Sequence, residues 1–114
     1  MNEERGIVVA ADAGISIRSF ADISNALGEC LGARGLILTE SDLAQEFFDL
    51  RSGLAGELFQ KFINYKVRVA LVVPNPHGYG ERFAELAYEH STHNMIRFVD
   101  SEDEATVWLA ALEP

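Results

Sequence analysis

The residues best suited to bind a ligand or a partner lie in the stretch Phe-Phe-Asp-Leu-Arg-Ser-Gly-Leu-Ala-Gly-Glu, residues 47–57. The guanidinium of Arg51 matches the planar geometry of a carboxylate or a phosphate, and Asp49 beside it can serve as an acid or a base. Ser52 occupies the position expected for a helix N-cap, where unpaired N–H groups and a partial positive charge tolerate a phosphate. We therefore predict that Asp49, Arg51 and Ser52 lie together, partly exposed, at the start of a helix.

Two glycines in the same stretch are unfavourable for the helix that follows. Gly53 and Gly56 each cost about 1 kcal/mol relative to alanine inside a helix, so either close packing or an approaching ligand should compensate. We therefore include Gly53 and Glu57 in the predicted ligand- or partner-binding site. In the plainer interpretation, Ser52 only caps the helix and the glycines only allow close packing.

The histidines offer an incomplete metal site. His90 and His93 are three residues apart, and Glu89 adds an oxygen on the same predicted helix face. Zinc takes three or four ligands, and we identify no fourth, so we expect neither a metal nor a cofactor. A histidine near a helix C-terminus is also stabilised by the helix dipole.

Motifs for nucleophilic or nucleotide chemistry are also incomplete. There is no Gly-x-Ser-x-Gly nucleophile elbow. Gly78-Tyr79-Gly80 supplies two glycines of the dinucleotide-binding pattern, but Phe83 stands where the third belongs. We interpret this segment as an ordinary loop.

Charge and cysteine content exclude several classes of partner. The chain has 114 residues and a net charge of −9, which argues against a nucleic-acid-binding surface and against an anionic membrane. The single cysteine, Cys30, excludes an internal disulfide and lies on the apolar stripe of a predicted helix. No apolar run approaches a membrane span and the acidic N-terminus is unlike a signal peptide, so we expect a cytoplasmic protein.

The hydrophobic pattern predicts a single α/β domain over residues 1–114. Continuous apolar runs indicate strands of a parallel sheet covered on both faces, and apolar residues at helical spacing indicate the helices between them. We expect a mostly parallel sheet of four or five strands with helices packed on it. The predicted strands are residues 7–11, a short strand at 15–17 that pairs with the first as a hairpin, 36–38, 67–73 and 95–99; the predicted helices start at Ser19, Gly53, near Phe83 and at Ser101.

The main predicted helix, residues 53–65, carries an apolar stripe wider than one sheet face requires. One sheet face absorbs a stripe about 100° wide, and this helix has apolar residues at positions 54, 55, 58, 59, 62 and 63. Either the preceding segment folds over the helix or a second copy covers it. We predict a homodimer.

The stretch from Phe47 to Tyr65 resembles a bacterial family, the domain of unknown function numbered 4180, and the resemblance extends to residues 98–102. More distantly, the chain is similar to STAS domains, the fold of the anti-sigma factor antagonists. Those proteins carry Asp-Ser-Ser-Gly-Leu where this chain has Leu50-Arg51-Ser52-Gly53-Leu54. This likeness implies a STAS-like sheet, a regulatory role and phosphorylation at Ser52, although Leu50 and Arg51 depart from the pattern.

These observations favour a non-enzymatic regulatory domain that binds a protein partner through residues 49–57. The alternative is a small-molecule or anion binder, or a small enzyme, in which Arg51 clamps an anion and Asp49 acts as acid or base. Against the enzyme, the spacing reveals no nucleophile–base pair. A concave polar site around these residues would favour a ligand or an enzyme, and a filled, dry one would favour a protein partner.

Overall fold

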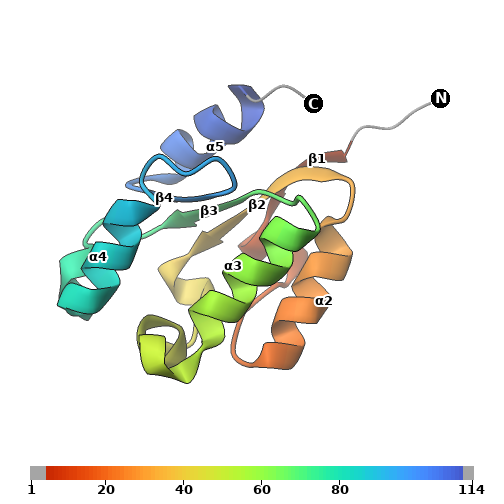
Figure 1. Cartoon of the computed structure of the whole chain (residues 1–114). Helices are drawn as coiled ribbons and strands as arrows, with labels where there is room; N and C mark the ends of the chain where they lie inside the picture. The colour runs from red at the N-terminus through yellow and green to blue at the C-terminus, as the bar shows by residue number, and fades with distance from the viewer. Residues whose placement is uncertain (1–4, 112–114) are drawn as a thin grey trace.

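Four apolar segments form one sheet in which all strands are parallel and follow one another in chain order (Figure 1). The computed structural model describes residues 5–111. The strands are β1 (Arg5–Val9), β2 (Ala33–Thr39), β3 (Val69–Val72) and β4 (Ile96–Val99). β3 is buried along its whole length, as its continuous apolar sequence predicts for a central parallel strand. The predicted α/β architecture is confirmed.

Three helices cover one face of the sheet, namely α2 (Phe20–Cys30), α3 (Leu54–Asn64) and α4 (Glu81–Glu89). Each connects two neighbouring parallel strands, and right-handed crossovers that all step in one direction place their helices on one side. The last helix, α5 (Glu102–Ala111), is not a crossover and packs on the opposite face. Figure 1 shows α2 and α3 side by side and α4 standing apart from them.

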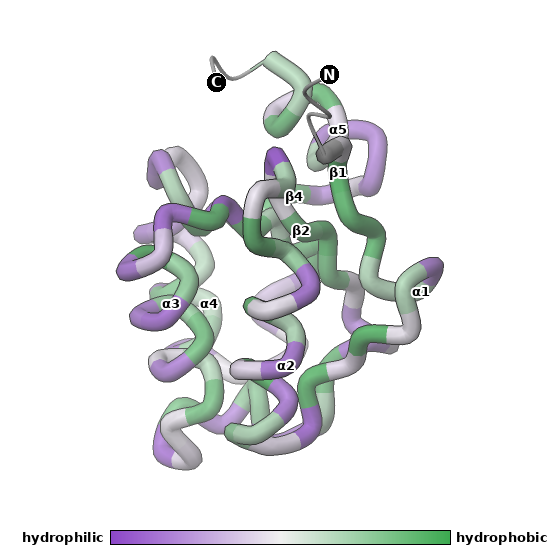
Figure 2. The backbone as a smooth tube through the Cα atoms, turned by 90° about the vertical axis from the view of Figure 1, so that its right-hand side faces the viewer, coloured by the Kyte–Doolittle hydropathy of each residue, from purple (hydrophilic) through white to green (hydrophobic). Residues whose placement is uncertain are grey.

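The register of the strands explains the two cores. Leu36 pairs with Val69, which pairs with Ile96. These side chains face α2, α3 and α4 and belong to the larger, front core. The residues that follow them in β2 and β3, Ile37 and Ala70, face α5 and belong to a smaller, rear core. Figure 2 shows hydrophilic and hydrophobic segments alternating along α3, as expected of a helix with one face on a core. The rear core contains Ile37, Ala70, Val72, Val99, Ala105, Trp108 and Leu109.

The predicted hairpin at residues 15–17 is wrong. β1 continues directly into a short helix, α1 (Ala10–Ala13), which ends at Gly14 with a φ of 72°. Ile17 then makes a single parallel bridge to Leu43. The alternation that suggested a strand arises because Ile15 and Ile17 both point into the front core, and burial of two side chains needs no paired strand.

The wide stripe of α3 is buried within the chain itself. Leu54, Ala55, Leu58, Phe59 and Phe62 are all buried, with α2 on one flank and the segment between β2 and α3 on the other. Ile63 is the stripe residue that remains exposed, at 37%. The stripe therefore does not need a second copy to cover it, and the homodimer stays a prediction.

Within residues 5–111, no helix combines the length and the apolar character that crossing a lipid bilayer requires.

Candidate functional site

The segment between β2 and α3, residues 40–53, is a chain of three single helical turns, which we call the crossing segment. The turns are η1 (Glu40–Asp42), η2 (Gln45–Phe48) and η3 (Leu50–Ser52). The first turn is fixed by Asp42, whose buried carboxylate accepts hydrogen bonds from the backbone N–H and the hydroxyl of Thr39, at 2.8 and 3.0 Å. The end of β2 thus sets the direction of the crossing segment.

Asp49 and Arg51 form a local pair at the last turn. One carboxylate oxygen of Asp49 accepts from the backbone N–H of Arg51 at 3.1 Å and from its Nε at 3.2 Å. These bonds hold the pKa of the Asp49 carboxyl below its usual value. The Arg51 side chain is 90% exposed, and its two terminal NH₂ groups have no partner among the described residues.

Ser52 is not the N-cap of α3, contrary to expectation. The N-cap is Gly53, whose φ of 80° lies in the left-handed region that favours glycine. Ser52 sits one residue earlier, where its hydroxyl donates to the Glu46 carbonyl at 2.6 Å and accepts from the Leu54 N–H at 3.2 Å. Ser52 therefore ties the crossing segment to the start of α3.

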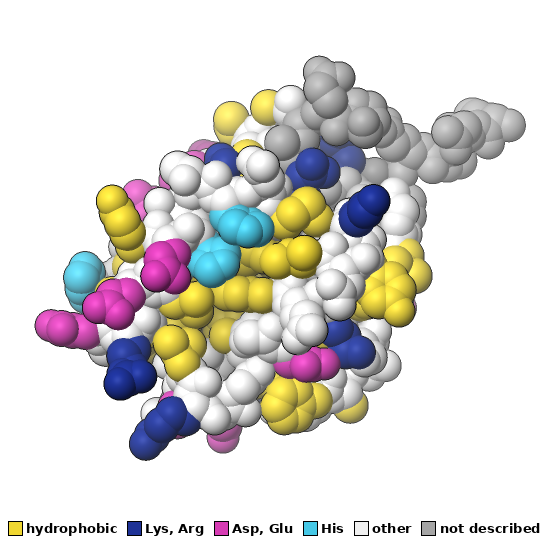
Figure 3. Space-filling view, in the orientation of Figure 1, with side chains coloured by type: hydrophobic (Ala, Val, Ile, Leu, Met, Phe, Trp, Pro, Cys, Tyr) yellow, Lys and Arg dark blue, Asp and Glu magenta, His cyan; other side chains and the backbone are white. Residues whose placement is uncertain are grey.

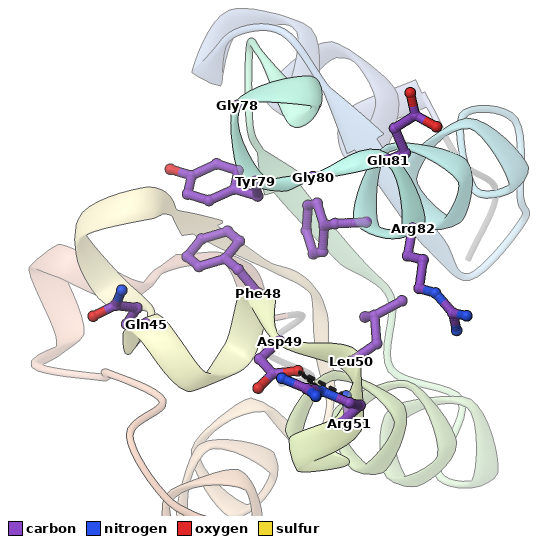
Figure 4. Close-up of a pocket in the computed structure, with 11 residues that line it drawn as sticks. Gln45, Phe48, Asp49, Leu50, Arg51, Gly78, Tyr79, Gly80, Glu81 and Arg82 are labelled. Carbon is purple, nitrogen blue, oxygen red and sulfur yellow. Dashed lines mark hydrogen bonds and ion pairs between the residues drawn. The ribbon is translucent and has the colours of Figure 1, made fainter.

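An open groove of about 830 Å³ lies beside this turn, between the crossing segment and the start of α4 (Figure 4). Its second wall comes from the turn η4 (Pro76–Tyr79), which follows β3. β2 and β3 are neighbours, so the groove lies beyond the carboxyl ends of two adjacent parallel strands. Its lining residues are Gln45, Phe48, Asp49, Leu50, Arg51, Gly78, Tyr79, Gly80, Glu81, Arg82 and Phe83.

Three aromatic rings join the two walls. Phe48 and Tyr79 are stacked, with ring centroids 3.8 Å apart and an interplanar angle of 9°, and Phe83 meets both edge-on. The Tyr79 hydroxyl also donates a hydrogen bond to the Glu40 carboxylate. This bond, followed by partial burial, raises the pKa of Tyr79 to about 12. Tyr79 thus stays neutral at physiological pH and links η4 to the crossing segment.

Arg82 brings a second guanidinium to the groove from the first turn of α4. It is exposed and has no hydrogen bond or ion pair with any described residue. In Figure 4 its side chain extends toward Leu50 on the opposite wall, whereas Glu81 is directed away. The groove therefore combines an aromatic wall with two arginines.

The structure places only part of the predicted site in this groove. Asp49 and Arg51 line it, whereas Ser52 and Gly53, which follow them in the chain, do not. Glu57 lies on α3 and pairs with Lys61 at 3.8 Å. The second wall of the groove was not predicted from the sequence. Gly78-Tyr79-Gly80, an aromatic residue between two glycines in a predicted loop, was the signal that could have indicated it.

The two neighbouring histidines have structural partners. His90 caps the end of α4 through its Nδ1, 2.9 Å from the Leu86 carbonyl. The Nδ1 of His93 accepts from the N–H groups of Met95 and Ile96 at 3.0 and 3.1 Å. Among the residues that the structure describes, no three His, Cys, Asp or Glu side chains gather as a metal site would require.

A family model described as a domain of unknown function (DUF4180) matches residues 2–109 of the chain. No curated protein and no solved structure gives a significant match.

Proposed function

The chain belongs to the DUF4180 family, which is described as a domain of unknown function, and from the geometry of the groove we propose that it is a non-enzymatic protein-interaction domain. An extended segment of a partner protein binds between the crossing segment and α4. The observation that carries this proposal is the partly exposed aromatic stack of Phe48 on Tyr79, with arginines beside it.

The residue types of the groove are those that dominate protein interfaces. Aromatic side chains and arginine are enriched in interfaces, and tyrosine and arginine are prominent among the residues whose truncation costs most binding energy. Tyr79 is 37% exposed, so its ring still has apolar surface to bury.

The shape of the groove favours a peptide over a compact small molecule. Its volume, about 830 Å³, lies within the range of ligand pockets, but such pockets bury most of their ligand. This groove is concave and partly polar, as a ligand site would be, yet it is open on one side. A longer ligand that continues beyond the groove gains the contacts that a small one lacks there.

The titratable groups of the groove favour binding over catalysis. General acid–base catalysis works best with a pKa close to the working pH. Here the pKa of Asp49 is shifted down by Arg51 and that of Tyr79 up to about 12 by Glu40. Both shifts lead away from neutrality.

Selection from a random peptide library tests the proposal. The immobilised protein should enrich peptides that bind with micromolar affinity in calorimetry, and Tyr79→Ala should weaken them at least about tenfold. Tyr88→Ala is the matched control, because Tyr88 is 81% exposed on α4 and does not line the groove. Circular dichroism checks that both variants fold. Failure to enrich any peptide, or equal losses in the two variants, would show the proposal to be wrong.

Three narrower expectations belong to the same proposal. A regulatory role is supported by the likeness to STAS domains, and the cytoplasmic location stays a prediction. Self-association would need a surface other than the buried stripe of α3. Phosphorylation of Ser52 would break its bond to the Glu46 carbonyl, because the esterified oxygen no longer carries the proton that it donates and the phosphate brings negative charge beside that carbonyl oxygen. A modified Ser52 should therefore loosen the wall of the groove.

A further inference from the structure

The carboxylates around the groove already have hydrogen-bond donors. Asp49 accepts two bonds from Arg51, and Glu40 accepts the hydroxyl of Tyr79. The remaining carboxylate, Glu81, also borders a neighbouring groove on the outer face of α4 and is directed away in Figure 4. The acidic groups are therefore poorly placed to bind a cation in the groove.

The cationic groups, in contrast, have donors to spare. Asp49 engages the Nε of Arg51, which leaves both terminal NH₂ groups for a planar, bidentate acceptor. Arg82 has all its donors free with respect to the described residues. The two arginines come from opposite walls of the groove, with the Arg51 guanidinium beside Asp49 and the Arg82 side chain extending toward Leu50 (Figure 4), so each wall offers a donor to a bound carboxylate.

The local charge differs from that of the whole molecule. The chain carries a net charge of −9, whereas the lining of this groove is balanced, with Arg51 and Arg82 against Asp49 and Glu81. Figure 3 shows basic side chains at the lower left of one face, with acidic side chains just above them and hydrophobic ones beside them. Repulsion from distant carboxylates is screened beyond about 8 Å at physiological salt, whereas direct charge-assisted hydrogen bonds persist.

We propose that the groove selects a partner segment in which a carboxylate side chain lies next to an aromatic one. The carboxylate binds Arg82 and Arg51, and the neighbouring ring packs on Phe48, Tyr79 and Phe83. This inference rests on the proposed function, because it names the chemistry of the segment that the same groove binds.

Four labelled hexapeptides test this selectivity. They are Gly-Ser-Asp-Phe-Ser-Gly and its Asn-Phe, Lys-Phe and Asp-Ala analogues, each acetylated, amidated and titrated by fluorescence anisotropy. The Asp-Phe peptide should bind about tenfold more tightly than the Asn-Phe and Asp-Ala peptides, and the Lys-Phe peptide should bind weakest.

The variant Arg82→Gln tests whether the Arg82 side chain causes the preference for a carboxylate. Glutamine suits a helix and Arg82 has no partner to lose, so the fold is preserved. The Asp-Phe preference over Asn-Phe should fall to about twofold or less in this variant. Arg18→Gln is the matched control, because it removes one charge from an exposed arginine outside the groove and should leave the preference unchanged.

The outcomes separate this inference from the proposed function. If the peptides bind regardless of charge and Tyr79→Ala still weakens them, the carboxylate preference is wrong and the interaction domain stands. Tightest binding of the Lys-Phe peptide, or no saturable binding of any of the four up to millimolar concentration, would overturn the inference. The proposed function itself fails if the library selection also yields no peptide, or if Tyr79→Ala and Tyr88→Ala weaken the selected peptides equally.

Discussion

The ring of Phe48 lies almost parallel to the ring of Tyr79, with centroids 3.8 Å apart. Phe48 belongs to the crossing segment after β2 and Tyr79 to the turn after β3. Stacked rings at this separation contribute more than the burial of their area alone. The contact holds two otherwise separate loops together, so the shape of the groove depends on it.

Tyr79→Phe should destabilise the protein modestly. The variant keeps the stacked ring but removes the hydroxyl that donates to Glu40, so the free energy of unfolding should fall by about 1 kcal/mol. Urea denaturation measures this change. Tyr88→Phe is the control, because the Tyr88 hydroxyl has no partner among the described residues; an equal loss in both variants would contradict the role of the Glu40 bond.

The same bond predicts a stability change at alkaline pH. The pKa of Tyr79 is about 12 in the folded protein, against an ordinary value of 10.0. The folded state therefore holds the phenol proton more tightly than the unfolded state does. The contribution is therefore complete below pH 10 and is lost as the pH rises through about 12. The difference in unfolding free energy between the wild type and Tyr79→Phe should shrink across this window, and a constant difference would refute the assignment.

His93 should make the protein less stable in mild acid. Burial, followed by the charges of His90 and Arg97, lowers the pKa of its imidazole from 6.5, and its Nδ1 must be unprotonated to accept the N–H groups of Met95 and Ile96. The unfolded state therefore binds the proton more readily. The contribution is complete above pH 6.5 and is lost as the pH falls through the lowered pKa.

Unfolding between about pH 7 and about pH 5 measures this effect. His93→Asn supplies the comparison, because an amide oxygen can accept the same N–H groups and does not titrate. The wild type should lose stability relative to this variant on acidification. If the two proteins respond identically, the imidazole of His93 is not the group responsible.

Two glycines should respond to alanine in opposite directions. A Cβ at Gly35 would lie 2.5 Å from a methyl group of Leu109 and 3.0 Å from the Arg68 carbonyl oxygen, so Gly35→Ala should push α5 from the sheet and cost about 1–3 kcal/mol. A Cβ at Gly56 on α3 meets nothing within 4 Å, so Gly56→Ala should stabilise by about 1 kcal/mol. Thermal unfolding checks both. A loss at Gly56 would mean that its neighbourhood is tighter than described.

The Gly56 environment also settles one expectation from the sequence. We expected close packing or a nearby ligand to explain both glycines of the helix start. The positive φ of Gly53 explains that residue through its backbone, whereas close packing does not explain Gly56.

The sequence by itself determined the fold class and most of the elements. The runs predicted as a central strand at 67–73 and as a helix at 53–65 appear as β3 (Val69–Val72) and α3 (Leu54–Asn64). Continuous apolar runs and helical spacing are local signals, which the chain carries wherever it folds. The proximity of Asp49 and Arg51 could also be predicted from the sequence, because the two residues are only two positions apart in the chain.

Only the tertiary structure decided which distant segments of the chain meet at the groove. The second wall of the groove, from Gly78 to Phe83, is about thirty residues from the first and is brought beside it only because β3 pairs with β2 in parallel. The bridge of Ile17 to Leu43 was hidden from sequence for the same reason. Periodicity reports whether a side chain is buried, but not which distant segment buries it, since that depends on strand order and on the side of the sheet to which each crossover folds.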